Sequence, residues 1–320
     1  MAEDQEFTLP PLEERPLVTF ALFAYNQEKY IREAVEGAFA QTYEPLEIIL
    51  SDDCSTDRTF EIMEEMVASY KGPHEVYVQK NKENLGLIRH TNKIFSLNRN
   101  KVVIFAAGDD ISRPDRTTKT VAQFQEDKKA LAVHSKVKQM TIDGRVLDEL
   151  TPPVVRHNLK TLDTITAPGI HIGATAAYRT EIISFFGEVS ETDTYEDLIL
   201  GFRAKLLNGL SFIDEPLVLY RTGVGISTQR KPNSYKERIQ IRKCIISRHL
   251  ATMRQRSRDC KITSNYTLQH AVDDHITALQ MRDAFYRSPQ SLVIELLKQR
   301  KKHALHAISA ELKYCLGLIN

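Results

Sequence analysis

Three pairs of adjacent acidic residues in the 320-residue sequence could carry chemistry: Asp52-Asp53, Asp109-Asp110 and Glu196-Asp197. Carboxylates can coordinate Mg²⁺ or Mn²⁺, hard ions that prefer oxygen ligands, and a cation held in this way neutralises phosphate charge. A positioned carboxylate can also remove the proton of an attacking hydroxyl. A structural alternative exists for each pair, because acidic residues between a strand and a helix often cap the helix or interact with its dipole.

The first two acidic pairs each follow a predicted strand. Between residues 17 and 107, short apolar runs alternate with amphipathic stretches, which is typical of parallel strands joined by helices. The pattern predicts strands at 17–24, 46–50, 75–79 and 102–107 and helices at 28–41, 59–69 and 87–97. This order predicts a doubly wound α/β sheet. In such a sheet ligands bind beyond the carboxyl ends of the strands, where Asp52-Asp53 and Asp109-Asp110 would meet.

The second half of the chain has a more mixed pattern. Helices are expected at 113–126 and 195–207, a β-hairpin at 131–147 around Asp143-Gly144, a strand at 171–178 and two short strands at 211–213 and 217–220. The prolines of 151–168 indicate a loop or flap between the halves. Helical periodicity continues from residue 230 to the end, so the mixed sheet flanked by helices is expected to be followed by an all-α C-terminal region.

The charge and the cysteines exclude several classes of protein. Lys and Arg number 43 and Asp and Glu 42, so no global field attracts nucleic acid, and we expect no nucleic-acid partner. Residues 1–229 nevertheless contain 25 basic and 35 acidic side chains, whereas residues 230–320 contain 18 and 7. The four cysteines form no CxxC pair, and the sequence shows neither a secretory signal nor an apolar window of about 18 residues. The expected location is therefore cytoplasmic.

The acidic pairs suit a nucleotide only under certain conditions. The glycine-rich motifs GxGxxG and GxxxxGK[ST] are absent, which argues against a classical dinucleotide site or P-loop. Because carboxylates repel a bare diphosphate, they must bind the neutral parts of the nucleotide or hold a cation between themselves and the phosphates. Asp52 is a candidate for the first role and Asp109 and Asp110 for the second. A base at Glu196-Asp197 would face them across a cleft.

These motifs, in this order, resemble those of the family 2 inverting glycosyltransferases, whose nucleotide-binding half has the GT-A fold. The resemblance covers about residues 17–228 and rests on Ala24-Tyr25-Asn26, Asp52-Asp53-Cys54-Ser55-Thr56-Asp57, Asn84-Leu85-Gly86 with Arg89 and Asn92, Asp109-Asp110 with Arg113-Pro114-Asp115-Arg116, and Glu196-Asp197 with Arg203. In this interpretation the chain comprises an N-terminal extension (1–16), a GT-A-like domain (17–229) with a nucleotide-binding half (17–116) and an acceptor half (117–229), and a helical basic region (230–320).

The resemblance implies a function and a role for each motif. The implied reaction is transfer of a sugar from a UDP-sugar to a hydroxyl of a glycan or lipid-linked acceptor, in bacterial surface polysaccharide or glycolipid synthesis. Asp197 would be the general base, with Glu196 beside it, and Asp110 with Asp109 would hold Mn²⁺ or Mg²⁺. The implied nucleotide-binding residues, of which Tyr25 packs on the base and Asp52 hydrogen-bonds to it, are Ala24, Tyr25, Asn26, Asp52, Asp53, Arg89 and Asp109.

Two departures from the family pattern keep other interpretations open. Ala107 stands where many members have the first Asp of Asp-x-Asp, and Gly223 stands where they have the His of Tyr-Arg-x-His. His171 or Arg221 would then supply the missing contact on the acceptor or diphosphate side. The alternatives are a non-catalytic nucleotide-sugar-binding or scaffold protein, and a sugar nucleotidyltransferase, although the glycine-rich basic loop of the latter is absent.

The basic C-terminal region has two possible partners. An apolar stretch at 291–297 leads into Lys298, Arg300, Lys301 and Lys302, a cationic amphipathic pattern suited to an anionic membrane surface. Packing of these helices on the catalytic domain or on a second subunit is the alternative. Peripheral contact with the inner face of the cell membrane and homo-oligomerisation both stay open.

Overall fold

A computed structural model of the chain describes residues 10–147, 159–167, 169–225, 232–288 and 301–315. One mixed sheet forms its centre, with the strand order β3-β2-β1-β4-β7-β6-β8-β5. The strands β1 (Val18–Ala24), β2 (Leu46–Asp52), β3 (Glu75–Lys80) and β4 (Val102–Ala107) are parallel. Because β2 and β4 flank β1 on opposite sides, the strand order reverses there, and such a switch point is where doubly wound sheets bind ligands.

The other half of the sheet contains both strand directions. The short strand β7 (Ala177–Arg179) pairs antiparallel with β4 and with β6 (Ala132–Met140). The long strand β8 (Leu210–Arg221) runs parallel to β6, and β5 (Ile111–Ser112) pairs antiparallel with β8. The sheet is therefore mixed, as the sequence predicted.

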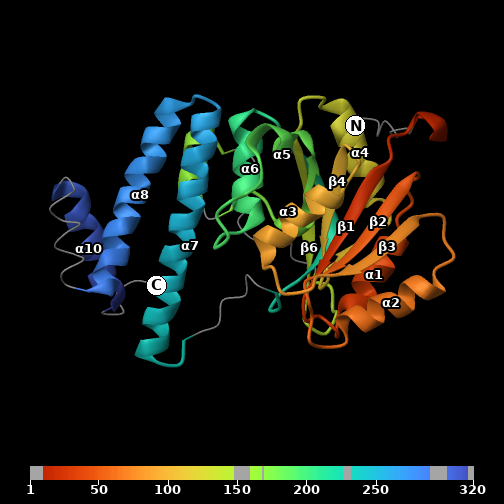
Figure 1. Ribbon diagram of the computed structural model, residues 1–320, viewed down its shortest axis with the longest axis horizontal. Helices are drawn as coiled ribbons and strands as arrows, with labels where there is room; N and C mark the ends of the chain where they lie inside the picture. Colours follow the sequence, from red (N-terminus) through yellow and green to blue (C-terminus); the bar gives the residue numbers. More distant parts are fainter. Residues whose placement is uncertain (1–9, 148–158, 168, 226–231, 289–300, 316–320) are drawn as a thin grey trace.

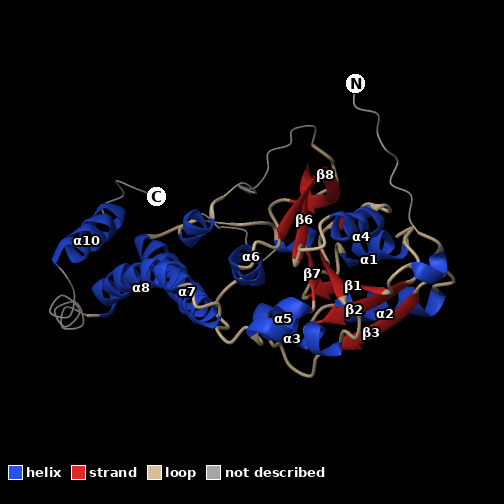
Figure 2. Cartoon of the chain, turned by 90° about the horizontal axis from the view of Figure 1, so that it is seen from above, coloured by secondary structure: helices blue, strands red, loops and turns tan. Residues whose placement is uncertain are grey.

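Helices cover both faces of the sheet, because successive strand residues point to opposite sides. On one face α1 (Ile31–Phe39), α2 (Thr59–Ser69) and α4 (Arg116–Glu126) share a core with β-strand residues such as Phe20 and Leu22. On the other face α3 (Leu87–Leu97), α5 (Glu181–Phe186) and α6 (Glu196–Leu206) pack on residues such as Ala21 and Phe105. Figure 2 shows the sheet between these two groups of helices.

The predicted elements of the first half agree closely with the structure. The ranges of α2, α3 and β4 coincide with the predicted ones. The helix predicted at 28–41 is shorter, because Asn26 has a φ of 53° and the chain enters α1 through a turn. The helix predicted at 113–126 begins at Arg116.

The strand predicted at 171–178 is wrong for most of its length. A 3-10 turn, η3 (Gly173–Thr175), replaces the first part, and only the end belongs to β7. A Cβ atom on Gly173 would collide with the carboxylate of Glu196, so the absence of a side chain lets this turn approach the start of α6. Close contact with α6 therefore displaces the extended conformation that the apolar pattern favoured.

Two further predictions for the second half need correction. The short strands at 211–213 and 217–220 form one strand, β8, whose register against β6 shifts around Lys136 and Pro216. Proline lacks an N–H donor, so the interruption in the pattern marks an irregularity and not the end of a strand. The turn at Asp143-Gly144 is present, but the chain after it pairs with β6 only through an isolated antiparallel bridge between Met140 and Val146.

The C-terminal region is helical, as predicted. It contains α7 (Tyr235–Ile262), α8 (Tyr266–Arg287) and α10 (Lys301–Cys315), which lie at the opposite end of the molecule from β3 (Figure 1). Apolar residues of α7 and α8 share a core with Phe202 of α6. Lys298 and Arg300 of the predicted membrane-binding pattern lie outside the described residues. No helix within the described ranges combines the length and apolar character needed to cross a membrane.

A buried ion pair joins α6 to α7. Arg203 donates from Nε and from a terminal nitrogen to the two carboxylate oxygens of Asp259, at 2.9 and 3.1 Å, and donates to the carbonyl oxygen of Gly187 at 2.8 Å. Both side chains of the pair are fully buried. The contact fixes the helical region against the helix that carries Glu196-Asp197.

Replacing Asp259 with alanine should lower the free energy of unfolding by about 3–5 kcal/mol, because Arg203 would stay buried without its anionic partner. Urea denaturation followed by circular dichroism measures this change. Asp283→Ala is the control: it breaks the Arg287–Asp283 pair, whose side chains are 59% and 29% exposed, and should cost less than about 1 kcal/mol. Losses of similar size in the two variants would contradict the importance of the buried pair.

Candidate active site

Three loops meet where β1, β2 and β4 end. The N–H of Asp53 donates to the carbonyl oxygen of Ala24 at 2.9 Å, and the N–H of Gly108 donates to that of Phe23 at 2.8 Å. The residues that follow the three strands are therefore held side by side. Tyr25-Asn26, Asp52-Asp53 and Asp109-Asp110 occupy this edge of the sheet, where the doubly wound topology was expected to place them.

The loop after β1 leaves one aromatic side chain exposed. The amide oxygen of Asn26 accepts from the N–H of Thr56 at 2.9 Å, and its own N–H donates to Ser55 Oγ at 2.8 Å. These bonds tie the first loop to the second. Ala24 is buried at the strand end, whereas the ring of Tyr25 is 40% exposed, which suits stacking on a flat ligand.

Asp52 and Asp53 are buried and hold the surrounding loops. The carboxylate of Asp52 accepts from the N–H and from the hydroxyl of Ser55. The carboxylate of Asp53 accepts from Asn81 Nδ2 at 2.7 Å and from the N–H groups of Leu85 and Gly86 at 2.9 Å each. These contacts hold loops together, but neither carboxylate caps α2, whose N-cap has no side-chain hydrogen bond, and contact of either residue with a nucleotide stays a prediction.

Cys54 occupies a position that favours glycine. Its φ of 66° lies in the left-handed region, which costs an L-residue about 1–2 kcal/mol. The family pattern that the sequence resembles has glycine at this place, and glycine adopts this conformation without steric cost. The thiol is partly exposed at the edge where the three loops meet.

Asp109 and Asp110 form a buried carboxylate pair after β4. Oδ1 of Asp110 accepts from the N–H of Arg221 at 2.8 Å. Burial raises the pKa of Asp109, and burial together with the charge of Asp109 raises the pKa of Asp110 well above its usual range. The nearby guanidinium groups of Arg221 and Arg116 only partly offset this effect. The negative charge of the pair is therefore incompletely balanced by the protein.

This pair fits a divalent cation that substrate helps to hold. Within the described ranges, no cluster of three or more His, Cys, Asp and Glu side chains could enclose a metal ion. Mg²⁺ and similar ions are commonly bound by one or two carboxylates together with substrate phosphates and water. Asp109 and Asp110 match that ligand set, with Ala107 in place of a further carboxylate.

Arg221 is committed to structural contacts. Its Nε donates to the carbonyl oxygen of Asp109 at 3.0 Å, and its terminal nitrogens contact the carbonyl oxygen of Ile142 and the carboxylate of Glu33. The guanidinium also lies 4.7 Å from the ring centre of Tyr30. Its side chain therefore ties β8 to α1 and to the end of β4, beside Asp109 and Asp110, and its replacement of the missing histidine at Gly223 stays a prediction.

His171 lies in the interior, and its contact with a ligand stays a prediction. The ring is 2% exposed, and Nε2 lies 2.5 Å from the hydroxyl of Tyr178. Burial lowers the pKa of His171 to about 3, so the ring is neutral. The ring packs in the interior against Gly201 of α6. Arg89, by contrast, is exposed on α3, where its Nε donates to the carbonyl oxygen of Leu85 at 2.8 Å.

Glu196 and Asp197 begin α6 and are held in a buried environment. Burial and the charge of Asp197 raise the pKa of Glu196 to about 8. Burial raises the pKa of Asp197 to about 6, against the opposing effect of the N–H groups of Leu198 and Gly173. Oδ1 of Asp197 is buried and has no hydrogen-bond partner. Near neutral pH the pair therefore shares one proton, and Asp197 is the member that can accept another.

Arg256 of α7 supports this helix start. Its Nε and one terminal nitrogen donate to the carbonyl oxygen of Leu198 at 3.1 and 2.7 Å, and the other terminal nitrogen donates to that of Thr164 at 2.8 Å. The side chain is 1% exposed, and its charge favours the ionised form of Asp197. The sequence offered no signal for this residue, because Arg256 is one of many basic residues in the C-terminal region.

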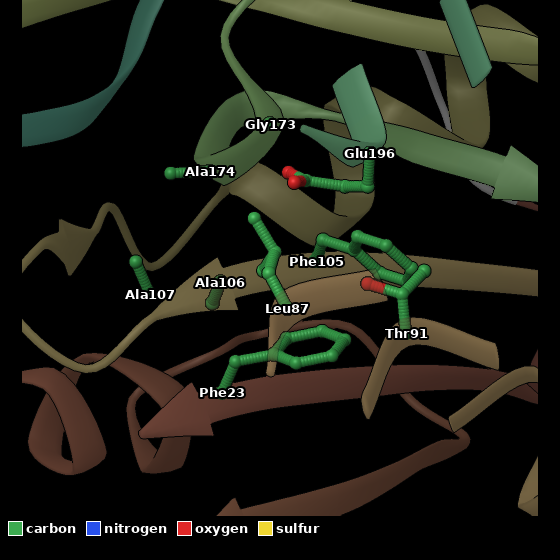
Figure 3. Close-up of a pocket in the computed structure, with 9 residues that line it drawn as sticks. All are labelled: Phe23, Leu87, Thr91, Phe105, Ala106, Ala107, Gly173, Ala174 and Glu196. Carbon is green, nitrogen blue, oxygen red and sulfur yellow. The ribbon is translucent and has the colours of Figure 1, made fainter. Parts of the chain in front are cut away.

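A small pocket connects the start of α6 with the end of β4. Its volume is about 70 Å³, and Figure 3 shows the carboxylate of Glu196 over its upper side, next to Gly173. The lining residues are Phe23, Leu87, Thr91, Phe105, Ala106, Ala107, Gly173, Ala174 and Glu196. Ala107 lies two residues before Asp109, so the pocket lies between the strand end that leads into the second acidic pair and the helix start that carries the third. Asp52 ends β2, which pairs with β1, the strand that carries Phe23.

Comparison with known proteins agrees with this geometry. The family described as "Glycosyl transferase family 2" matches residues 19–185. The chain therefore belongs to glycosyltransferase family 2. An uncharacterized glycosyltransferase of Haemophilus influenzae is 35% identical over 124 residues, which cover 39% of this chain and 38% of the relative. The chain spans only 16% to 66% of the length of eight such curated relatives.

Solved structures share the fold at low sequence identity. Residues 1–349 of S. aureus TarS, in complex with UDP-GlcNAc, superpose with a TM-score of 0.52 at 18% identity, covering 87% of this chain and 88% of that one. The mannosyltransferase PcManGT from Pyrobaculum calidifontis, in complex with GDP-Man and Mn²⁺, gives a TM-score of 0.53 at 18% identity, covering 96% and 89%. The GT-A-like fold expected from the sequence is thereby confirmed.

Proposed function

We propose that this chain is an inverting glycosyltransferase that moves a sugar from a UDP-sugar to a hydroxyl of a glycan or lipid-linked acceptor, in bacterial surface polysaccharide or glycolipid synthesis. One observation carries the proposal: the start of α6, with Glu196-Asp197, borders the same pocket as the end of β4, which leads into Asp109-Asp110. A displacement reaction needs a base and a site for the leaving phosphate on opposite sides of one carbon atom, and this arrangement can supply both.

The donor nucleotide is proposed to lie across the ends of β1 and β2. The exposed ring of Tyr25 would pack on the base, Asp52 and Asp53 would line the base site, and Arg89 would approach the diphosphate. The TarS structure contains UDP-GlcNAc and the PcManGT structure contains GDP-Man, so related folds hold both nucleotides. UDP is the nucleotide that we propose for this chain.

Asp109 and Asp110 are proposed to hold Mn²⁺ or Mg²⁺ together with the diphosphate. When bound, such a cation stabilises the negative charge of the departing nucleotide. Burial raises the pKa values of both residues, because it disfavours their negative charge. A bound cation would neutralise that charge, so the raised pKa values support a cation site. PcManGT, which shares the fold, was solved with Mn²⁺.

Asp197 is proposed to be the general base. Its carboxylate takes the proton of the acceptor hydroxyl while the acceptor oxygen forms a bond to the anomeric carbon. The bond between that carbon and the phosphate oxygen breaks, and UDP leaves from the opposite face, so an α-linked donor gives a β-linked product. A pKa of about 6 keeps Asp197 ionised near neutral pH, as a base requires.

Binding and turnover assays test the proposal and its alternatives. Calorimetry with UDP and GDP, with and without Mn²⁺, should show that UDP binds and that Mn²⁺ strengthens binding. Slow hydrolysis of a UDP-sugar in the absence of acceptor should follow. UDP binding without any turnover would favour a non-catalytic binding protein, and formation of a nucleotide-sugar from a nucleoside triphosphate would favour a nucleotidyltransferase.

The pH dependence of kcat/KM should reflect Asp197. The rate should fall about tenfold per pH unit below a pKa of about 6 and level off above it, because only the ionised carboxylate accepts a proton. Replacing Arg256 with methionine should move this limb to higher pH, since the lost charge no longer favours the ionised form. Arg256→Lys, which keeps the charge, should leave it in place. A limb that stays unmoved in Arg256→Met would contradict the electrostatic role of Arg256.

The remaining proposals concern organisation and location. We propose the boundaries 17–229 for the GT-A-like domain and 230–320 for the helical region, with the buried pair Arg203–Asp259 joining them.

We also propose that the protein is cytoplasmic and contacts the inner face of the membrane, where it would meet lipid-linked acceptors. Liposome flotation with the charges of Lys298, Arg300, Lys301 and Lys302 removed tests this contact, and unchanged flotation would contradict it.

A further inference from the structure

The pocket beside Glu196 is too small for a sugar ring. Its volume is about 70 Å³. A single water molecule needs about 10–15 Å³ of such space, so the pocket accepts a group of about five non-hydrogen atoms. A hexose ring with its hydroxyl groups is about twice as large. The pocket therefore suits one substituent of a sugar that lies outside it.

The walls of the pocket are mostly apolar. Phe23, Leu87 and Phe105 surround its centre in Figure 3, and the small side chains of Ala106, Ala107 and Ala174 leave the space open. An apolar lining gains free energy by removing a methyl group from water. It gains nothing from a hydroxyl or hydroxymethyl group alone, so the occupant is expected to end in a methyl group.

One polar group in this lining has no partner. Thr91 of α3 is 1% exposed, and its hydroxyl oxygen has no hydrogen-bond partner in the protein. In Figure 3 this oxygen is directed toward the pocket, on the side of Phe23 and Phe105. Buried hydroxyl groups are nearly always hydrogen-bonded, so an unpaired one that lines a pocket points to a ligand atom that completes the bond.

The second polar group of the lining is the carboxyl group of Glu196, on the side of Gly173. Near neutral pH the Glu196-Asp197 pair keeps one negative charge, which disfavours an anionic occupant such as the carboxylate of a uronic acid, and a carboxyl oxygen of Glu196 can accept a hydrogen bond from an N–H group. The occupant is therefore expected to combine a methyl end, an acceptor for Thr91 and a donor for Glu196. An acetamido group has these three features in four non-hydrogen atoms.

We propose that this pocket receives the acetamido group of the donor, and that the enzyme uses a 2-acetamido-2-deoxy sugar linked to UDP. This inference rests on the proposed function, because it assumes that the donor sugar lies between Asp109-Asp110 and Glu196-Asp197. The methyl group packs against Phe23 and Phe105, the carbonyl oxygen accepts from Thr91, and the amide N–H donates to Glu196.

Calorimetry in the presence of Mn²⁺ tests the assignment with UDP, with UDP-GlcNAc against UDP-glucose, and with UDP-GalNAc against UDP-galactose. In at least one pair, the acetamido sugar should bind about tenfold more tightly than its hydroxyl counterpart, the scale of one or two net hydrogen bonds and a buried methyl group. Thr91→Val keeps the shape of the side chain without its hydroxyl and should reduce that preference severalfold while the affinity for UDP is unchanged.

Ser96→Ala is the matched control, because it removes an exposed hydroxyl from the same helix outside the pocket and should change no affinity. Equal affinity within both pairs, or an equal loss for both sugars in Thr91→Val, would overturn the acetamido pocket while the proposed function stands. A protein that binds neither UDP nor any of the four UDP-sugars would instead overturn the proposed function, and the inference with it.

Discussion

Replacing Asp197 with asparagine should reduce sugar transfer by about 10²–10⁴-fold, the usual contribution of a positioned general base, while the affinity for UDP stays nearly unchanged. Asparagine has the same shape, and its amide oxygen can still accept from the N–H groups of Leu198 and Gly173. What is lost is the ability to take the acceptor proton. Steady-state kinetics and calorimetry with UDP measure the two quantities on the same preparation.

Glu196→Gln is the matched control for this experiment. Burial and the charge of Asp197 raise the pKa of Glu196 to about 8, so Glu196 is mostly protonated at pH 7 and glutamine resembles its native state. We therefore expect a much smaller loss of transfer than in Asp197→Asn. The opposite order would assign the base to Glu196, and parallel losses of transfer and UDP affinity in Asp197→Asn would contradict a catalytic role.

Replacing Asp110 with asparagine should abolish the dependence on divalent cation and lower transfer by about 10²–10³-fold, the effect of losing one preorganised electrostatic group at the leaving oxygen. The amide oxygen of asparagine can still accept from the N–H of Arg221, so the loop should keep its conformation. In calorimetry, UDP should bind the variant equally with and without Mn²⁺.

Asp214→Asn is the control for the metal experiment, because Asp214 is 74% exposed and pairs only with Lys136 among the ion pairs found in the described residues. It should retain the response to Mn²⁺ and full transfer. An Asp110→Asn protein that still binds UDP more tightly with Mn²⁺ would place the cation elsewhere.

The sequence predicted the convergence of the acidic residues because topology determines it. The strands before Asp52 and Asp109 are recognised from local apolar runs, and parallel strands with crossover helices bring their carboxyl ends to one edge. The helix that begins at Glu196 was also predicted within one residue of its start. Periodicity and chain direction suffice for these features, since none depends on the contact of one particular side chain with another.

Side-chain environments in the second half could not be predicted in this way. His171 was expected near ligand from its place at the start of a predicted strand, but the structure buries its ring against Tyr178, a contact between side chains seven residues apart that the pattern did not indicate. Arg256 of α7 reaches the start of α6, where it contacts Leu198, although the two residues are 58 positions apart in the sequence. Such contacts depend on how distant helices pack, which leaves no periodic signal in the sequence.

The most direct test of the account is a crystal structure of the Asp197→Asn variant with Mn²⁺ and an intact UDP-sugar. On this account, we expect Tyr25 to stack on the uracil, Asp110 to ligate the cation beside the diphosphate, and residue 197 to face the anomeric carbon from the side opposite the phosphate. A donor bound away from the ends of β1 and β4, or an anomeric carbon turned away from α6, would contradict it.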